Sequence, residues 1–288
     1  MPLYDLTTRL EATRALDGLV DRLDHAVPAV LRKGPVRDGL AGRWLGHPLH
    51  PVITDLPVGL WSSATVLDLV GGRRSHGAST LLTALGLVAA TPTVASGVVE
   101  WLDADRPRQR LGVVHAAANA VAEVCYLASL GAKLAGRRRA GRRAALLGGA
   151  ALGIGGYLGG HLSYARGVGV DHTLHHRAAT PGAIAVTRSD DGRLERTSGE
   201  TYLVVGGTAV AGAIAVPDRC TRCGGALQRL RPHRGEEELR CPHDGSRFAP
   251  ARGAILAGSA TTPLPRFTLA RAGEHWRLRA HDAGTGTT

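Results

Sequence analysis

The chain has 288 residues, a formal net charge of +11, and 44% hydrophobic but only 4% aromatic residues. This length allows about two domains. The positive charge does not indicate nucleic-acid binding, because the chain lacks aromatic side chains interleaved with basic ones that would stack on bases. Arginines instead crowd residues 137–143 beside long apolar runs, where they fix topology and bind anionic headgroups. We therefore expect membrane lipid, and no nucleic acid, as a partner.

Residues 1–45 are predicted to form an N-terminal amphipathic segment. Between residues 6 and 31, apolar residues recur at roughly helical spacing among charged ones. Such a helix lies on a membrane surface or packs on neighbouring helices, although a solvated helix without a role has the same pattern. No signal peptide is expected, because the segment contains no apolar h-region.

Four membrane-spanning helices are predicted within residues 46–166. A bilayer needs about 20 mostly apolar residues per helix, and four such runs occur at residues 52–70, 77–99, 111–134 and 144–165. The second and fourth runs carry no charge, whereas the first contains Asp55 and Asp68 and the third contains Glu123. The first and third are therefore expected to span as partners in a bundle, and glycines spaced four apart in the fourth favour close helix packing.

Several polar residues should lie at one face of this bundle. If the spans alternate in direction, His47 and His50 before the first span, His115 early in the third and His161 late in the fourth share that face. Ionisable groups at membrane depth are costly and usually functional. They suggest a haem b or metal site with His115 and His161 as axial ligands, or a quinone pocket near His47 and His50. An interfacial hydrogen-bond network is the simpler alternative.

The membrane orientation follows only weakly from charge. Nine Lys and Arg residues flank the side of the termini and eight flank the opposite side, so the positive-inside rule decides nothing. The densest basic loop, residues 133–143, favours termini outside, whereas the missing signal peptide and the long charged N-terminal segment favour cytoplasmic termini. We expect a multi-pass protein of the cell membrane, with its C-terminal part in the cytoplasm.

A linker at residues 167–182 is expected to lead into a small antiparallel β-domain at residues 183–288. Short β-like runs punctuated by Gly, Pro and Asp support this domain. They occur at residues 183–187, 201–205, 209–216, 238–240, 267–270 and 276–279. The predicted fold class is thus a two-domain α+β protein, with a four-helix transmembrane bundle followed by a small antiparallel β-domain.

The β-domain contains two cysteine motifs, Cys220-Thr-Arg-Cys223-Gly-Gly and Cys241-Pro-His-Asp244-Gly-Ser-Arg-Phe. Over residues 183–281 they resemble the Rieske 2Fe–2S family, whose loops contain Cys-x-His and Cys-Pro-x-His-Gly-Ser-x-Phe. The resemblance implies a Rieske-like fold, one-electron transfer, and Cys220 and Cys241 as cluster thiolates. Arg222 and Asp244 stand at the positions of the family's two histidines.

That double replacement leaves three interpretations open. The domain has no cluster and Arg222 pairs with Asp244, since a guanidinium offers no lone pair to iron. Alternatively, an altered 2Fe–2S cluster uses Cys220 and Cys241 with His243, Cys223 or Asp244. The third interpretation is a zinc ion bound by three cysteines and a histidine, namely Cys220, Cys223, Cys241 and His243.

The segment Gly-His47-Pro-Leu-His50-Pro before the first span resembles an uncharacterised bacterial four-helix membrane family over residues 44–170, often fused to Rieske-type domains. Together the two resemblances imply a membrane-bound Rieske-type electron-transfer protein. Its partner would be a redox protein or a quinone, and it would be an electron-transfer component rather than a stand-alone enzyme. The alternative is a cluster-free scaffold that binds partners.

Overall fold

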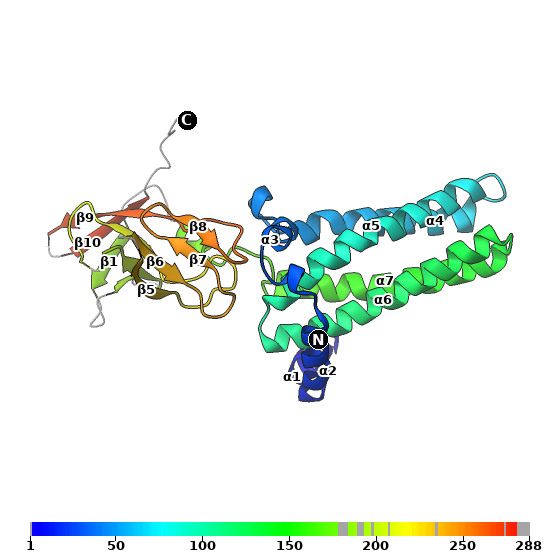
Figure 1. Ribbon diagram of the computed structural model, residues 1–288, viewed down its shortest axis with the longest axis horizontal. Coiled ribbons are helices and arrows are strands. Elements are labelled where there is room, and N and C mark those ends of the chain that lie inside the picture. Colours follow the sequence, from blue (N-terminus) through cyan, green and yellow to red (C-terminus); the bar gives the residue numbers. More distant parts are fainter. Residues whose placement is uncertain are drawn as a thin grey trace. The chain divides into compact units, whose positions relative to one another are not determined.

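The computed structural model describes residues 2–177, 184–188, 193–196, 199–206, 208–233, 236–273 and 275–280. The chain divides into two compact units, residues 1–168 and residues 169–288. The first unit is helical and the second is built from β-strands (Figure 1).

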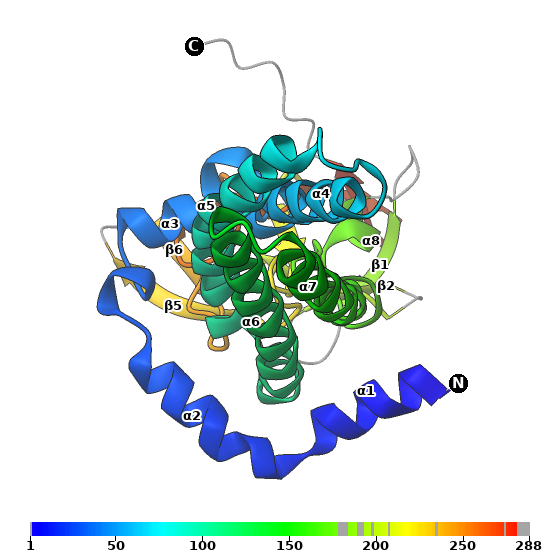
Figure 2. The same ribbon diagram turned by 90° about the vertical axis from the view of Figure 1, so that its right-hand side faces the viewer.

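Four long helices form the bundle of the first unit: α4 (Leu49–Val70), α5 (His76–Leu102), α6 (Arg106–Leu134) and α7 (Arg138–Gly160). A π-helical turn, His161–Ala165, continues α7. Helices α4 and α6 each contact both α5 and α7, so they occupy one diagonal of the bundle (Figure 2).

Within the described residues, three helices are long and apolar enough to cross a membrane: α5, α6, and α7 with its π-helical turn. The four predicted spans correspond to four helices, but α4 is not among these three. The charges of Asp55 and Asp68 lower its hydropathy. Whether α4 also spans stays a prediction.

Many small residues of the bundle are buried, and many of its large apolar residues are exposed. Ala90, Ala122 and Ala145 are buried, whereas Val88 is 70% exposed and Leu147 is 66% exposed. Water would penalise this distribution, whereas lipid tails accept it, because helices in lipid associate through small residues that allow close approach. The packing therefore supports the membrane assignment that the sequence predicts.

The hairpins α4–α5 and α6–α7 repeat the same contacts. Trp61 of α4 lies against Gly86 of α5, and Tyr126 of α6 lies against Gly148 of α7. The two aromatic residues are 65 positions apart in sequence and the two glycines are 62 apart. The Trp61 and Tyr126 rings stack on each other, with centroids 4.6 Å apart and an interplanar angle of 9°. The bundle thus has an approximate twofold symmetry between diagonal helices.

A buried ion pair follows the same repeat. Asp68 of α4 and Lys133 of α6 are also 65 positions apart, and Lys133 Nζ lies 2.7 Å from Asp68 Oδ2. The ammonium group also donates to the hydroxyls of Ser79, at 2.7 Å, and Thr83, at 2.9 Å. The buried ammonium group therefore pairs with one carboxylate and donates to two hydroxyls.

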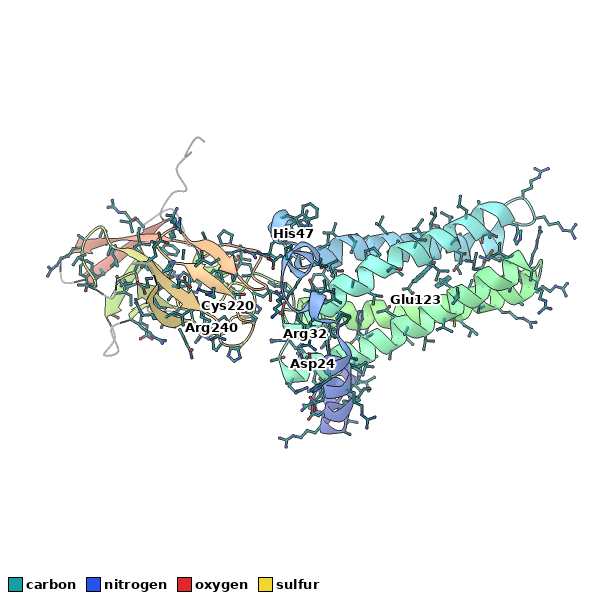
Figure 3. All side chains as sticks on the ribbon, viewed as in Figure 1. Asp24, Arg32, His47, Glu123, Cys220 and Arg240 are labelled. Atoms are coloured by element: carbon teal, nitrogen blue, oxygen red, sulfur yellow. The ribbon has the colours of Figure 1, made fainter. Side chains whose placement is uncertain are left out.

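The N-terminal segment is several short helices rather than the single predicted helix. Its α-helices are α1 (Pro2–Ala12), α2 (Asp17–Ala26) and α3 (Pro35–Ala41). Figure 2 shows α1 and α2 bent around one end of the bundle. Arg110 of α6 donates to both carboxylate oxygens of Asp17, at 2.7 and 2.8 Å, and Arg166 donates to Glu11 at 2.6 Å. Asp24 and Arg32 form a further exposed ion pair inside the segment (Figure 3).

The second unit contains a closed antiparallel barrel and a four-stranded antiparallel sheet. The barrel order is β1-β10-β9-β4-β3-β2 and the sheet order is β5-β6-β7-β8. The barrel strands are β1 (Ile184–Arg188), β2 (Leu194–Arg196), β3 (Thr201–Val204), β4 (Ile214–Pro217), β9 (Phe267–Ala272) and β10 (His275–Ala280). The sheet strands are β5 (Gln228–His233), β6 (Glu236–Arg240), β7 (Arg247–Ala249) and β8 (Ala254–Ala257).

The antiparallel β-domain is confirmed, with differences in its elements. The predicted run at 209–216 is a strand only from Ile214 onward. The strands β2, β5, β7 and β8 were not predicted, because charged or very short sequences mask their alternation. Part of the predicted linker, residues 178–182, lies outside the described residues, and the short helix α8 (Leu174–Arg177) precedes them.

Candidate metal centre

Two loops with the same backbone geometry carry the cysteine motifs. One joins β4 to β5 and the other joins β6 to β7. In each loop, the cysteine N–H donates to the carbonyl five residues later, at 2.8 Å in both cases. A glycine four positions after each cysteine, Gly224 or Gly245, donates its N–H back to the cysteine carbonyl, at 3.0 and 3.1 Å. The φ angles of these glycines are 70° and 72°, a conformation that favours glycine.

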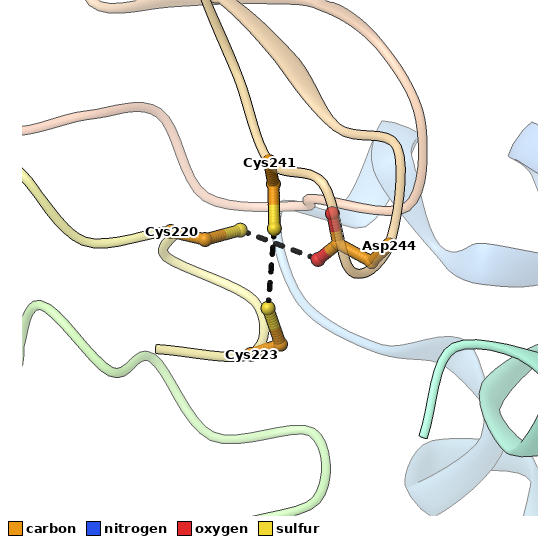
Figure 4. A group of neighbouring side chains, drawn as sticks. All are labelled: Cys220, Cys223, Cys241 and Asp244. Atoms are coloured by element: carbon orange, nitrogen blue, oxygen red, sulfur yellow. Dashed lines mark hydrogen bonds between the residues drawn. The ribbon is translucent and has the colours of Figure 1, made fainter. Parts of the chain in front are cut away.

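This geometry presents the first and fourth residues of each motif to a common point. Cys220 and Cys223 come from one loop, and Cys241 and Asp244 come from the other (Figure 4). Their four ligand atoms all lie within 4.8 Å of one another. Cys223 Sγ is 3.4 Å from Cys241 Sγ, and Cys220 Sγ is 3.2 Å from Asp244 Oδ2.

The spacing of the group fits a single ion. Tetrahedral coordination with a metal–sulfur distance of about 2.3 Å places two thiolates of one ion about 3.8 Å apart. The four atoms of the group are separated by distances of that order. A 2Fe–2S core holds its ligand pairs on two separate irons, which sets the pairs farther apart than the ligands of one ion. The observed geometry therefore fits one ion better than the cluster that the Rieske resemblance implies.

Protons are shared unequally within the group. Contacts with Cys220 and Cys223 favour the Cys241 thiolate and lower the pKa of Cys241 to about 2. Contacts with Cys223 and Cys241, followed by burial, raise the pKa of Cys220. For Cys223, the contact with Cys220 lowers the pKa, but the contact with Cys241 and burial raise it to about 12. Burial is the largest cause of the raised pKa of Asp244. The free group thus holds one thiolate and two thiols.

The surroundings of the group are apolar and closely packed. Cys220 and Cys241 belong to a buried cluster that also includes Leu203, Val216, Leu227, Leu239, Phe248, Ala260 and Leu264. Ser246 Oγ accepts a hydrogen bond of 3.0 Å from the Ala260 N–H, which fastens the segment after β8 to the second loop. This packing limits access of water to the cysteines, so the ligands keep their relative positions.

The structure brings together some of the ligands proposed from the sequence and leaves others apart. It brings Cys223 and Asp244 to Cys220 and Cys241, but it leaves His243 exposed, with its ring packed against Gly225. The group that could hold a metal ion thus contains Asp244 and not His243. In each motif, the group contains the cysteine and the residue three positions after it. His243 is only two positions after Cys241 and lies outside the group.

The predicted Arg222–Asp244 ion pair is not among the contacts that the described residues show for Asp244, and it stays a prediction. The Asp244 carboxylate accepts from the Cys220 thiol, at 3.2 Å, and from the Ser246 N–H, at 2.8 Å. Arg222 is buried and lines a small cavity with Asp171 and Thr261.

The linker histidines are close to the first cysteine loop. The His172 N–H donates to the Thr221 carbonyl at 3.0 Å, and His176 is buried edge-on against Tyr202, with ring centroids 5.0 Å apart. A pocket of about 370 Å³ is lined by His172, His175, His176, Glu200, Arg219 and Gly224. The sequence placed these histidines in a plain linker, and no signal in the sequence shows that they fold onto the β-domain.

The structure gives the bundle histidines separate partners. His115 Nδ1 donates to the Gly155 carbonyl at 2.8 Å, whereas His161 is buried, lies 3.9 Å from Glu11 and contacts the Tyr4 ring. His50 Nδ1 donates to the Thr93 carbonyl at 2.9 Å, and His47 is exposed beside Pro48. No observed contact brings His115 and His161 to one point, and haem and quinone binding stay predictions.

Comparison with known proteins identifies only the helical part. A family model described as "Predicted membrane protein (DUF2231)" matches residues 46–172. Residues 46–172 are thus similar to a family of predicted membrane proteins. This agrees with the resemblance predicted for residues 44–170. No curated protein and no solved structure shows a significant match. The Rieske resemblance of the β-domain has no family match behind it.

Proposed function

We propose that the chain is a membrane-anchored metalloprotein in which Cys220, Cys223, Cys241 and Asp244 bind one metal ion, and that it carries single electrons at the membrane surface. The observation that carries this proposal is the convergence of four ligand atoms within 4.8 Å of one another. Iron on such a set would exchange one electron, received from a quinol or a reduced protein and passed to an oxidised protein partner.

Two features of the site favour a redox role. Cys220 and Cys241 are fully buried in an apolar cluster, whereas Cys223 and Asp244 are only partly buried. A metal on this set would therefore be shielded from water on one side and lie near the surface on the other, where a partner can approach. The Rieske resemblance of both loops points to the same class of reaction.

A second candidate function is a non-redox scaffold stabilised by zinc. Three thiolates and a carboxylate complete a tetrahedral set without an open position, which is the arrangement of structural zinc sites. Such an ion would tie the β4–β5 loop to the β6–β7 loop and contribute directly to folding.

The test is the metal content of the full-length protein, purified in detergent under anaerobic conditions after expression with ample iron and zinc. One iron per chain without labile sulfide, with a reversible one-electron reduction, supports the carrier. One zinc supports the scaffold. Two irons with labile sulfide support the cluster that the Rieske resemblance implies. A protein without any bound metal refutes all metal-dependent versions.

Matched variants assign the ligands. Asp244→Ala should lower metal affinity at least about 10-fold, since even the loss of a contact that only orients a ligand costs 10- to 100-fold. His243→Ala is the control, because this neighbour is exposed and outside the group. If both variants lose the metal equally, or if neither does, the assigned ligand set is incorrect.

A further inference from the structure

The repeat of the two hairpins extends to a pair of histidines. His50 of α4 and His115 of α6 are 65 positions apart, as are the stacked pair Trp61 and Tyr126 and the ion pair Asp68 and Lys133. Intervals of 11 and 7 residues separate the three positions along each helix, so they share one face. Two of the three pairs meet between the diagonal helices. The histidines occupy the third level of the same stripe.

Each imidazole is held in the same way by the adjacent helix. His50 donates from Nδ1 to the carbonyl of Thr93, and its Cε1 would lie 2.8 Å from a methyl group placed on Gly97. His115 donates from Nδ1 to the carbonyl of Gly155, and its Cε1 would lie 3.0 Å from a methyl group on Gly159. In both hairpins, a carbonyl and a glycine four residues later therefore fix the ring.

These hydrogen bonds determine the tautomer of both rings. A carbonyl oxygen only accepts, so Nδ1 carries the proton and Nε2 of a neutral imidazole carries the lone pair. An Nδ1–H bound to a backbone carbonyl is also the usual support of a histidine that binds a metal through Nε2. The two rings thus have the same pre-oriented state.

Both Nε2 lone pairs are available. Nothing in the part of the chain that the structure describes hydrogen-bonds to His50 Nε2. Asn119 Nδ2 lies 3.1 Å from His115 Nε2 but also 3.4 Å from His115 Nδ1. A donor in line with the Nε2 lone pair would be much farther from Nδ1. The amide of Asn119 therefore sits over the ring and leaves the lone pair open.

We propose that His50 and His115 form a second metal site, inside the bundle, in which the two Nε2 atoms bind one transition-metal centre. The shared chemistry is two neutral imidazoles on a metal such as iron, copper, nickel or zinc. The centre is either a bare ion or the iron of haem. The pairing differs from the pairing of His115 with His161 expected from the sequence, because His161 faces Tyr4 and Glu11.

The test uses the full-length protein in detergent and has two arms. In the first, the protein is expressed with ample haem and its visible spectrum is measured; a Soret band in the wild type that His50→Gln and His115→Gln each abolish assigns haem iron. In the second, equilibrium dialysis with Zn²⁺ counts bound ions; one ion that both substitutions weaken at least 100-fold assigns a bare ion. His161→Gln is the control and should change neither signal.

Gly97→Ala provides a variant that keeps both ligands. Its methyl group would displace the His50 ring, so the same signal should weaken about 10-fold or more, as supporting contacts do. Gly153→Ala is its control, because no atom lies within 4 Å of the added methyl group. The Cys241→Ser variant removes the ion of the β-domain only, so failure of that centre is distinguishable. The proposal is overturned if the wild type gives neither signal, or if His161→Gln removes the signal as His50→Gln does.

Discussion

The ion pair between Asp68 and Lys133 should be the most sensitive single contact of the bundle. The exposed fraction of the Lys133 side chain is 1% and that of Asp68 is 9%. In the variant Lys133→Met, the carboxylate keeps only the hydroxyl of Ser79 as a partner. Removing one member of a buried pair leaves an uncompensated charge and costs about 3–5 kcal/mol. At about 2–4 °C per kcal/mol for a unit of this size, the melting temperature should fall by about 6–20 °C.

Replacing both members should restore most of that loss. In Asp68→Leu/Lys133→Met no charge is left in the core. The two hydroxyls also keep backbone acceptors, since Ser79 donates to the Ala64 carbonyl at 3.2 Å and Thr83 donates to the Ser79 carbonyl at 2.8 Å. Buried pairs replaced by apolar residues of similar volume are often neutral or more stable. The double variant should therefore melt within about 5 °C of the wild type.

Thermal unfolding of the wild type, both single variants and the double variant in one detergent completes the cycle. The expected coupling energy is about 3 kcal/mol or more, because the penalty of each single variant disappears in the double variant. A loss of stability in the double variant that equals the sum of the losses in the two single variants would refute the reasoning. It would mean that the two charges do not depend on each other.

Two further predictions concern packing and protons. Gly148→Ala should destabilise the bundle by about 1–3 kcal/mol, since the methyl group would lie 3.0 Å from the Tyr126 ring. Thermal unfolding measures this loss against the control Gly153→Ala, which should be neutral or slightly stabilising. Equal effects of the two substitutions would contradict the prediction. Metal binding by the β-domain at pH 7 should release about two protons per ion, from Cys220 and Cys223, whose pKa values are raised, but none from Cys241, whose pKa is already lowered. Affinity should then fall about 100-fold per pH unit on acidification. Titration in buffers of different ionisation enthalpy counts the protons, and release of none would exclude ligation by Cys220 and Cys223.

The cysteine motifs predict the candidate metal ligands but do not distinguish among them. The spacing of Cys220, Cys223, Cys241 and Asp244 identified four candidate ligands, but it also allowed His243 and an ion pair with Arg222. The two loops decide between His243 and Asp244 as the ligand, because their shared hydrogen-bonding pattern turns the first and fourth residues inward. The direction of a side chain in a turn depends on its backbone dihedrals, which the sequence of a short loop does not reveal.

The order of apolar runs was enough to predict a helical membrane part before an antiparallel β-domain, because hydropathy and periodicity are properties of local sequence. Which residues meet between distant segments was decided only by the tertiary structure. The pairs Trp61–Tyr126 and Asp68–Lys133 depend on the diagonal placement of α4 and α6. Contacts between diagonal helices arise from packing of all four helices together, and no stretch of sequence by itself specifies them.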